Sequence, residues 1–370
     1  MNFPGIDHLV QPHLAQITPY QAGKPLEELA REMGLSDAIK LASNENPLGP
    51  SPLALAAIQD NLHTLHRYPD SHAYYLKEDL SRHLGVAPSQ LILGNGSDEV
   101  LDLLVRALVP PGGEVLSTDH TFLMYSLLTQ AVGGVFRFVP LKEMRVDLPG
   151  LARAVTDQTR LILINNPNNP TGTAFLRQEW EEFLASLPPH LTVVLDEAYI
   201  DFADDPQVPQ SLAYLAEDRL LVGLRTFSKA YGLAGLRIGY GFGPSKLMDY
   251  LNRLRLPFNV NRLAQVAARA ALTDTLFLER TLKVVLTGRA MICGELERLG
   301  LSYINSQANF ILIRVDRPAR EVYQDMLREG VIIRSMEEYG FSRHIRVNVG
   351  LPEENQRFLR ALIKVMGLKG

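Results

Sequence analysis

One stretch of the sequence decides the fold class, and it reads Leu161-Ile162-Leu163-Ile164-Asn165-Asn166-Pro167-Asn168-Asn169-Pro170-Thr171-Gly172. Its apolar run has no polar alternation, which is typical of a strand that is buried on both faces. The Asn and Pro residues that follow mark the end of the strand and a turn. Because open α/β sheets bind ligands at the carboxyl ends of their strands, the stretch predicts an α/β sheet with amide side chains at a ligand-binding edge.

Similar apolar runs recur on both sides of this stretch. They cover residues 91–93, 114–117, 135–139, 193–195, 220–224 and 236–241. Helical patterns separate them, as in residues 177–187, where Trp180, Phe183 and Leu184 share one face. We therefore expect an α/β fold, with a large domain in which helices sandwich a mostly parallel sheet.

After Pro257 the pattern changes to longer helices and a few short strands. Helices are expected at residues 261–272, 275–299 and 318–329, and strands at 309–315, 331–333 and 345–349. The polar, Pro-containing first forty residues lack a core of their own. We expect an N-terminal segment, residues 1–45, that docks on the small domain, a large domain at 46–257, and a small α+β domain at 258–370, built from both termini.

Composition excludes several classes of protein. With 46% hydrophobic and 21% charged residues, the 370-residue chain is an ordinary globular protein. Its one cysteine, Cys293, rules out an internal disulfide and Cys-rich metal sites, and favours a cytoplasmic location. A net charge of -4 gives no expectation of nucleic-acid or membrane binding. No run of eighteen apolar residues occurs, Met1 to Tyr20 do not resemble a signal peptide, and the histidines form no metal-ligand pattern.

A lysine follows the run at residues 220–224, in the sequence Thr226-Phe227-Ser228-Lys229. In a turn just past a buried strand its amine can be desolvated, which lowers its pKa and prepares it to form a Schiff base with a carbonyl. Arg237, eight residues on, suits a phosphate. The alternative interpretation is an ordinary surface lysine.

The run at residues 91–93 leads into Gly94-Asn95-Gly96-Ser97-Asp98-Glu99 and then a helical pattern. Glycines at a strand-to-helix turn, with the free N–H groups of the helix start, favour a phosphate. Glu99 stands where a dinucleotide motif needs a third glycine, so this motif does not indicate NAD. A simple glycine turn is the alternative.

The run at residues 193–195 delivers Asp196 and, three residues later, Tyr199. A carboxylate at the end of a buried strand needs a cation, and a protonated pyridine nitrogen would supply one. A strand-end ion pair or Mg²⁺ is the alternative. Together, a Schiff-base lysine, a phosphate cradle, an acid for a ring nitrogen and an Asn and Tyr for a ring hydroxyl meet the needs of pyridoxal 5'-phosphate.

With these motifs the sequence resembles the fold-type I pyridoxal-phosphate aminotransferases, and within them the histidinol-phosphate branch. The resemblance rests on the runs at residues 168–172 and 228–237, which are specific to the superfamily, and on softer matches at 17–20, 41–47, 67–69 and 345–350.

The resemblance implies a role for each matching residue. Lys229 would form the Schiff base, Asp196 would hold the ring nitrogen, and Tyr199 with Asn169 would bond the ring hydroxyl, so Lys229, Asp196 and Tyr199 are the expected catalytic residues. The phosphate would lie among Gly96, Ser97, Asp98, Arg237 and either Thr226 or Ser228, with Tyr68 contributed by the partner of a homodimer. Phe122, or else Tyr125, would pack on the ring. Substrates would bind to Tyr20, Asn44, Arg334 and Arg346.

The implied reaction is histidinol phosphate plus 2-oxoglutarate to imidazole acetol phosphate plus glutamate, in histidine biosynthesis. An aromatic amino-acid aminotransferase or a threonine-phosphate decarboxylase would share the same cofactor residues. A regulator that binds the cofactor without turnover is a more distant alternative. A serine hydrolase that uses Ser228 is disfavoured, because no G-x-S-x-G motif surrounds it.

Overall fold

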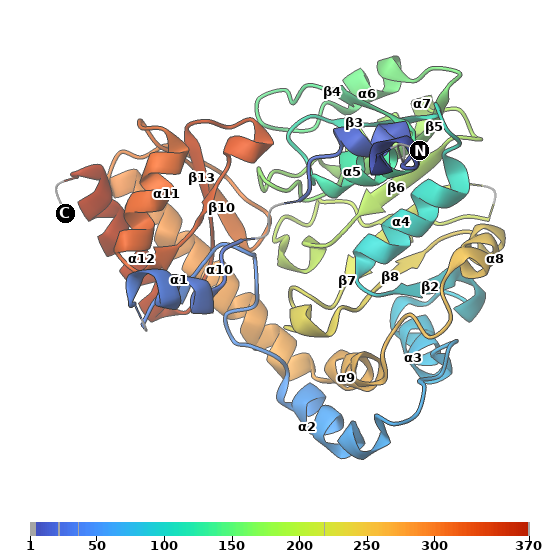
Figure 1. The fold of residues 1–370 in the computed structure, drawn as a ribbon, viewed down its shortest axis with the longest axis horizontal. Helices are drawn as coiled ribbons and strands as arrows, with labels where there is room; N and C mark the ends of the chain where they lie inside the picture. The colour runs from blue at the N-terminus through green and yellow to red at the C-terminus, as the bar shows by residue number, and fades with distance from the viewer. Residues whose placement is uncertain (1–4, 21–22, 36, 218, 369–370) are drawn as a thin grey trace.

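The structure, a computed structural model, describes residues 5–20, 23–35, 37–217 and 219–368 (Figure 1). Parts of the predicted N-terminal segment, namely residues 1–4, 21, 22 and 36, lie outside the described residues. In the described ranges no helix is both long enough and apolar enough to cross a membrane.

The central sheet has the strand order β2-β8-β7-β6-β5-β3-β4, counted over the residues that the structure describes. Only β8 runs antiparallel to its neighbours. The strands are β2 (Leu91–Gly94), β3 (Glu114–Thr118), β4 (Val135–Val139), β5 (Thr159–Asn165), β6 (Thr192–Asp196), β7 (Leu221–Thr226) and β8 (Gly239–Phe242). The predicted mostly parallel sheet and its apolar strands are confirmed.

Both faces of the sheet are covered, as strands without polar alternation require. In β5, Leu161 and Leu163 pack into one buried cluster, whereas Ile162 and Ile164 pack into the cluster on the opposite face. The first face carries α4 (Ser97–Leu108), α5 (Met124–Ala131) and α8 (Ser245–Leu254), and the second α6 (Leu148–Ala154) and α7 (Arg177–Ser186). The carboxyl ends of the parallel strands therefore form the edge that remains open to ligands.

The C-terminal part is a second layer beside the large sheet (Figure 1). Its antiparallel sheet has the order β12-β13-β10-β9 in the described chain. The elements are α9 (Arg262–Thr273), α10 (Thr275–Arg298), β9 (Tyr303–Ile304), β10 (Phe310–Arg314), α11 (Ala319–Arg328), β11 (Val331–Ile332), β12 (Arg334–Ser335), β13 (His344–Asn348) and α12 (Pro352–Met366).

The expected strand at residues 331–333 corresponds to β11, and a further short strand, β12, follows it at Arg334–Ser335. β11 pairs with β1 (Ile39–Lys40), whereas β12 pairs with β13, so the chain leaves one sheet and enters another at Ile333. An apolar run marks burial but does not identify the pairing partner. The change of sheet places Arg334 directly opposite Arg346 of β13.

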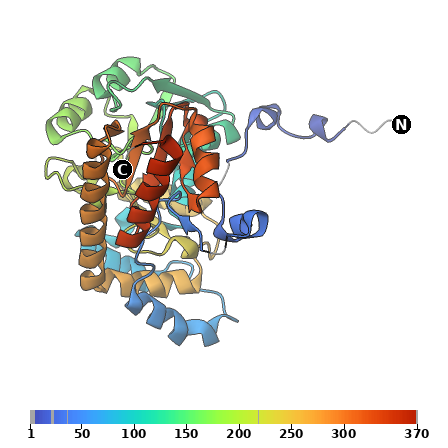
Figure 2. The ribbon, with the colours of Figure 1, turned by 90° about the vertical axis from the view of Figure 1, so that its left-hand side faces the viewer.

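The N-terminal residues contact both parts of the molecule. Leu29 of α1 (Leu26–Met33) packs with Leu327 and Ile332, beside the small sheet. The short helix η2 (Pro12–Gln16) contacts α5 on the large sheet instead, and the chain before it extends away from the body (Figure 2). The division of the chain at residues 45 and 257 stays a prediction.

A separate group of helices lies below the large sheet in Figure 1. There, α2 (Pro52–Asn61) packs on α9, and α3 (Tyr74–Leu84) contacts α9 as well. The short helices η1 (Ile6–His8), η3 (Leu62–Thr64), η4 (Pro88–Gln90), η5 (Ile200–Phe202), η6 (Ser211–Tyr214), η7 (Ala234–Leu236) and η8 (Glu337–Tyr339) complete the chain.

Candidate active site

A cavity of about 150 Å³ opens at the carboxyl ends of β5, β6 and β7. Ten of the residues singled out in the sequence line it: Ser97, Asp98, Phe122, Asn169, Asp196, Tyr199, Thr226, Ser228, Lys229 and Arg237. Asn165, which ends β5 and belongs to the stretch of residues 161–172, lines it too. Residues spread over 140 positions of the chain meet here because their strands end at the same edge.

Lys229 reaches the cavity from the turn after β7. Its Nζ donates a hydrogen bond to the Ser43 carbonyl at 3.2 Å and lies 5.7 Å from the centre of the Tyr199 ring. Burial, and next the nearby Arg346 guanidinium, lowers the pKa of Lys229 to about 8. Because a neutral amine is the nucleophile, this environment prepares Lys229 to attack a carbonyl near neutral pH.

Asp196 ends β6 on the floor of the cavity. One carboxylate oxygen accepts a hydrogen bond from the Ala198 amide at 3.1 Å, and the other from the Tyr125 hydroxyl at 3.0 Å. Burial raises the pKa of Asp196 to about 7, although both hydrogen bonds oppose the rise. A cation in the cavity would stabilise the ionised carboxylate, since its present surroundings supply only neutral donors.

The role of Tyr125 could not be inferred from the sequence. Phe122 lines the cavity, whereas Tyr125 is completely buried beneath it with its hydroxyl on Asp196. The two rings meet edge to face, with their centroids 5.8 Å apart. Phe122 precedes α5 and Tyr125 lies in its first turn, so the contact depends on how the chain enters the helix.

The start of α4 and Arg237 form a cradle for an anion. Gly96, with φ of 85°, precedes the helix, and a Cβ there would lie 2.6 Å from an Arg237 nitrogen. Arg237 Nη2 lies 3.3 Å from Asp98 Oδ2, and its Nη1 donates to Ser228 Oγ at 3.4 Å. Free helix-start amides, a guanidinium and serine hydroxyls are the donors that phosphate needs.

Thr226 and Ser228 differ in what they contact. The Thr226 hydroxyl oxygen accepts a hydrogen bond from the Ser228 amide at 3.0 Å, so it braces the turn. The Ser228 hydroxyl instead faces Arg237. Both line the cavity, and Ser228 lies closer to the anion cradle by virtue of that contact.

Asn44 and Arg346 contact residues that line the cavity, from the side of the small sheet. Asn44 Nδ2 donates to the Tyr199 hydroxyl at 2.9 Å. Arg346, only 6% exposed, donates to the Asn169 side-chain oxygen and, at 3.0 Å, to the Ala42 carbonyl. Asn44 Oδ1 and Arg346 Nε are buried and find no hydrogen-bond partner among the described residues. Such unsatisfied groups indicate a polar ligand.

Arg334 and Tyr20 lie farther out. Arg334 Nη2 forms an ion pair with Glu338 Oε2 at 2.7 Å, and its guanidinium lies 5.9 Å from the centre of the Tyr20 ring. A cavity of about 380 Å³ is lined there by Tyr20, Leu123 and Glu338. Tyr68 does not join either cavity in a single chain: it is 78% exposed and stacks on Phe258 at 4.7 Å.

The residues of the inner cavity fit pyridoxal phosphate. An amine of lowered pKa suits its aldehyde, a buried carboxylate suits its ring nitrogen, and an anion cradle suits its phosphate. Phe122 supplies an aromatic face. Over the described ranges no group of three His, Cys, Asp or Glu side chains is arranged to hold a metal ion.

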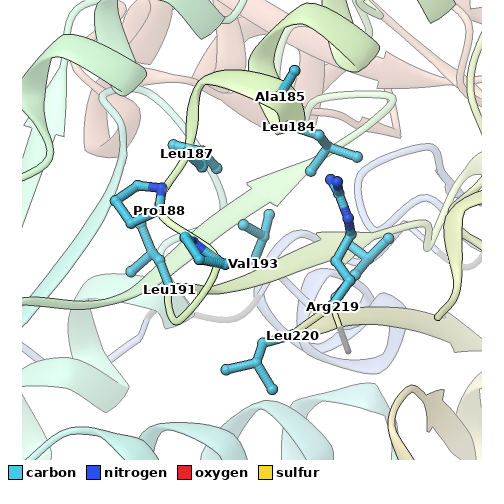
Figure 3. Close-up of a pocket in the computed structure, with 10 residues that line it drawn as sticks. Leu184, Ala185, Leu187, Pro188, Leu191, Val193, Arg219 and Leu220 are labelled. Atoms are coloured by element: carbon cyan, nitrogen blue, oxygen red, sulfur yellow. The ribbon is translucent and has the colours of Figure 1, made fainter. Parts of the chain in front are cut away.

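A different cavity lies at the amino ends of β6 and β7, with a volume of about 230 Å³ (Figure 3). Aliphatic side chains such as Leu184, Leu187 and Leu191 line it, together with Arg219. Among the described residues that line it there is no acid and no nucleophile, so they offer no catalytic arrangement.

Comparison with known proteins agrees with the chemistry of the inner cavity. The family model for class I and II aminotransferases matches residues 36–362. A histidinol-phosphate aminotransferase 2 of Pseudomonas fluorescens is 48% identical over 97% of both chains. A histidinol-phosphate aminotransferase 1 of Nitrosococcus oceani is 50% identical over 95% of both.

A solved structure is similar as well. The histidinol-phosphate aminotransferase of Sinorhizobium meliloti, determined in complex with pyridoxal 5'-phosphate, has a TM-score of 0.89 and 29% identity over 97% of both chains. The predicted fold, enzyme class and cofactor are thus confirmed. This chain belongs to the class I and II aminotransferase family and is a pyridoxal-phosphate-dependent aminotransferase.

Proposed function

We propose that this enzyme transfers the amino group of histidinol phosphate to 2-oxoglutarate, giving imidazole acetol phosphate and glutamate in histidine biosynthesis. The observation that carries the proposal is the pairing of Arg334 with Arg346 across β12 and β13. Directly opposed residues of an antiparallel pair point to the same face, so both guanidinium groups lie on one side of β12 and β13, where they can bind the same anionic group. Guanidinium groups can grip a phosphate or a carboxylate equally well, as both substrates require.

The names of the similar proteins support the same substrate. The relatives from Pseudomonas fluorescens and Nitrosococcus oceani carry that activity in their names, at 48% and 50% identity over nearly the full chain. The cytoplasm is the proposed location, since a biosynthetic enzyme with a single cysteine needs no oxidising compartment.

In the proposed mechanism Asp196, Tyr199 and Arg237 would orient the cofactor, and Lys229 would bond to it covalently. When bound, pyridoxal phosphate supplies an aldehyde that accepts the amino group and a ring that withdraws electrons from the substrate's Cα–H bond. The ionised Asp196 carboxylate would hold a proton on the ring nitrogen. Lys229 Nζ, whose lowered pKa of about 8 increases the share of neutral amine near neutral pH, would remove the proton from the substrate's Cα.

Arg346 serves two purposes in this mechanism. Its guanidinium anchors the substrate's anionic end, and its charge adds to the effect of burial in lowering the pKa of Lys229. Because it is held by Asn169 and the Ala42 carbonyl, it is already positioned when the substrate arrives. Such preorganisation reduces the entropy that binding must otherwise overcome.

The proposed active form is a homodimer in which Tyr68 binds the phosphate in the partner's site. Exposed apolar side chains gather on α2, on α3 and on the chain before α9, and they include Leu53, Leu55, Leu62, Leu65, Tyr68, Tyr74, Tyr75, Leu256 and Phe258. So large an apolar surface is typical of an interface. The helices that carry it lie together in Figure 1.

Mixing two inactive variants tests this sharing. Lys229→Ala and Tyr68→Ala homodimers are both expected to be impaired, yet a mixed dimer would contain one intact site, with Lys229 from one chain and Tyr68 from the other. Recovery of activity on mixing, at the mass of a dimer, is the expected result. If Tyr68 acts within its own chain, mixing will restore nothing.

An assay of amino donors tests the proposed reaction. The purified enzyme with pyridoxal phosphate is offered histidinol phosphate, phenylalanine or phosphothreonine, with 2-oxoglutarate as acceptor, while carbon dioxide release is followed. The highest kcat/KM is expected for histidinol phosphate. A preference for phenylalanine, or carbon dioxide released from phosphothreonine, would instead support an aromatic aminotransferase or a decarboxylase.

A further inference from the structure

Glu338 lines the second cavity and also forms an ion pair with Arg334. Its Oε2 lies 2.7 Å from Arg334 Nη2, with the Arg334 side chain 11% exposed and the Glu338 side chain 35% exposed. Glu338 and Tyr20 line the cavity of about 380 Å³, and Leu123 in its wall directly follows Phe122 of the inner cavity. A substrate that extends from the cofactor toward Arg334 therefore passes beside this carboxylate.

The backbone around Glu338 is firmly held. Glu338 lies in η8, whose residue Tyr339 is buried and whose carbonyl contacts His120. The amides of Tyr339 and Phe341 both donate to the Met336 carbonyl. Glu338 thus presents its carboxylate from a fixed base, and only its side chain has to move when a ligand arrives.

Arg346 and Arg334 differ in whether a negative charge lies beside them. Arg346 is held by two neutral oxygens and keeps its full positive charge, whereas the charge of Arg334 is balanced by Glu338. A second carboxylate on the substrate must then compete with Glu338 for Arg334. A ring N–H, by contrast, would find in Glu338 a charged acceptor, and hydrogen bonds to charged groups are the stronger class.

From this we infer that Glu338 is a specificity residue, which accepts a hydrogen bond from the imidazole N–H of the amino donor and opposes a second carboxylate at Arg334. The inference rests on the proposed function, because that function supplies the imidazole. It gives the two half-reactions opposite requirements at one carboxylate: the imidazole substrate benefits from Glu338, and the dicarboxylate has to displace it.

A competing interpretation treats the contact as an ordinary ion pair between residues four apart at the protein surface. Exposed pairs of that kind contribute little to stability. In that case removal of the charge would leave substrate preference unchanged. The small exposed fraction of Arg334 and the position of Glu338 in the cavity wall favour the functional role.

The test compares Glu338→Gln with Glu337→Gln, a control in the same short helix that does not line the cavity. In Glu338→Gln, kcat/KM for histidinol phosphate should fall about tenfold, as expected for the loss of a charged hydrogen bond. The dissociation constant of succinate, a dicarboxylate that cannot react, should fall about tenfold when measured by calorimetry with the holoenzyme. Glu337→Gln should change neither.

Weaker use of histidinol phosphate together with tighter binding of succinate is the signature that a merely structural ion pair would not produce. If the variant uses histidinol phosphate less well and also binds succinate less tightly, or if neither constant changes, Glu338 is not a specificity residue. If the unmodified enzyme fails to use histidinol phosphate, the proposed function fails and the imidazole assignment fails with it. Unchanged succinate affinity alone would overturn the charge role of Glu338 and leave the proposed reaction standing.

Discussion

The two ends of β6 and β7 carry cavities of opposite character. At the carboxyl ends lie Asp196 and the turn that delivers Lys229, in a cavity of about 150 Å³. At the amino ends lies a larger cavity of about 230 Å³, lined mostly by aliphatic side chains around Arg219 (Figure 3). The smaller cavity is the reactive one because buried polar groups converge in it. Convergence, rather than volume, identifies an active site in this fold.

Among substitutions at the two ends of β6 and β7, Lys229→Ala is expected to cause the largest loss of turnover. Loss of the amine removes both the covalent attachment and the base, so turnover should fall at least about a thousandfold. Lys246→Ala, an exposed lysine on α8, serves as the control and should keep full activity. Borohydride reduction of the holoenzyme followed by peptide mapping should locate the cofactor on Lys229; an adduct on another lysine would contradict the assignment.

Asp196→Asn should have the next largest effect. It preserves the shape of the side chain but removes the charge that holds a proton on the ring nitrogen, and kcat should fall about a hundredfold or more. The dissociation constant of the cofactor should rise as well. Asp249→Asn, on the surface of α8, is the matched control. Normal kcat in Asp196→Asn would show that the carboxylate is not needed for the chemistry.

Rates measured over a series of pH values test how much Arg346 lowers the pKa of Lys229. Only the neutral amine attacks, so the rate of cofactor attachment to the cofactor-free protein should rise with pH up to about 8 and then level off. In Arg346→Gln a neighbouring cation is lost, which raises the pKa of Lys229 and moves the midpoint to higher pH. Stopped-flow absorbance measures the rate, and Arg343→Gln is the control. An unmoved midpoint would contradict the coupling.

Tyr125→Phe, also at the carboxyl ends of the strands, should have a smaller effect, which is on the release of a proton when the cofactor binds. At pH values below about 7, Asp196 of the cofactor-free protein is largely protonated, so binding of a protonated ring should release that proton; above pH 7 the release should vanish. The hydrogen bond from Tyr125 lowers the pKa of Asp196. Its removal should therefore raise that pKa and shift the midpoint to higher pH. Calorimetry in buffers of different ionisation enthalpy measures the release.

Tyr214→Phe is the control for that measurement, since its hydroxyl contacts Glu181 on the surface. A midpoint that is the same in Tyr125→Phe and in the unmodified protein would mean that the hydroxyl does not influence the carboxyl group.

The smallest effect on turnover is expected from a substitution at the amino ends of β6 and β7. Leu191→Ala removes a buried side chain and should lower the free energy of unfolding by about 2 kcal/mol while kcat/KM stays the same. Leu276→Ala, at a highly exposed leucine, should change neither quantity. Thermal melting and steady-state kinetics measure the two effects. A large loss of kcat/KM in Leu191→Ala would break the contrast between the two ends.

Much of the carboxyl edge could be predicted from the sequence, because each of its groups follows directly after an apolar run. The predicted run at residues 135–139 coincides with β4, and the run at 193–195 lies within β6. Asp196 and Lys229 then follow from their positions after the strands. In a parallel sheet, chain order alone brings such residues to the same edge.

The parts that escaped prediction depend on contacts between elements. Tyr125 reaches Asp196 from a helix, and Glu338 reaches Arg334 from the short helix η8 that follows β12. Neither contact leaves a periodic trace in the sequence. Tyr68 is a related case, since its proposed role belongs to a second chain.

Asn44 forms hydrogen bonds with both the small sheet and the large domain. Asn44 has a φ of 55°, donates its amide to Asn348, accepts from Asn309 on its carbonyl, and reaches across to Tyr199 with its side chain. Few residues other than Asn and Gly tolerate that backbone angle, and glycine cannot span the gap. Laboratory evolution toward new amino donors is therefore free to vary the outer cavity, whereas position 44 should resist exchange in every successful lineage.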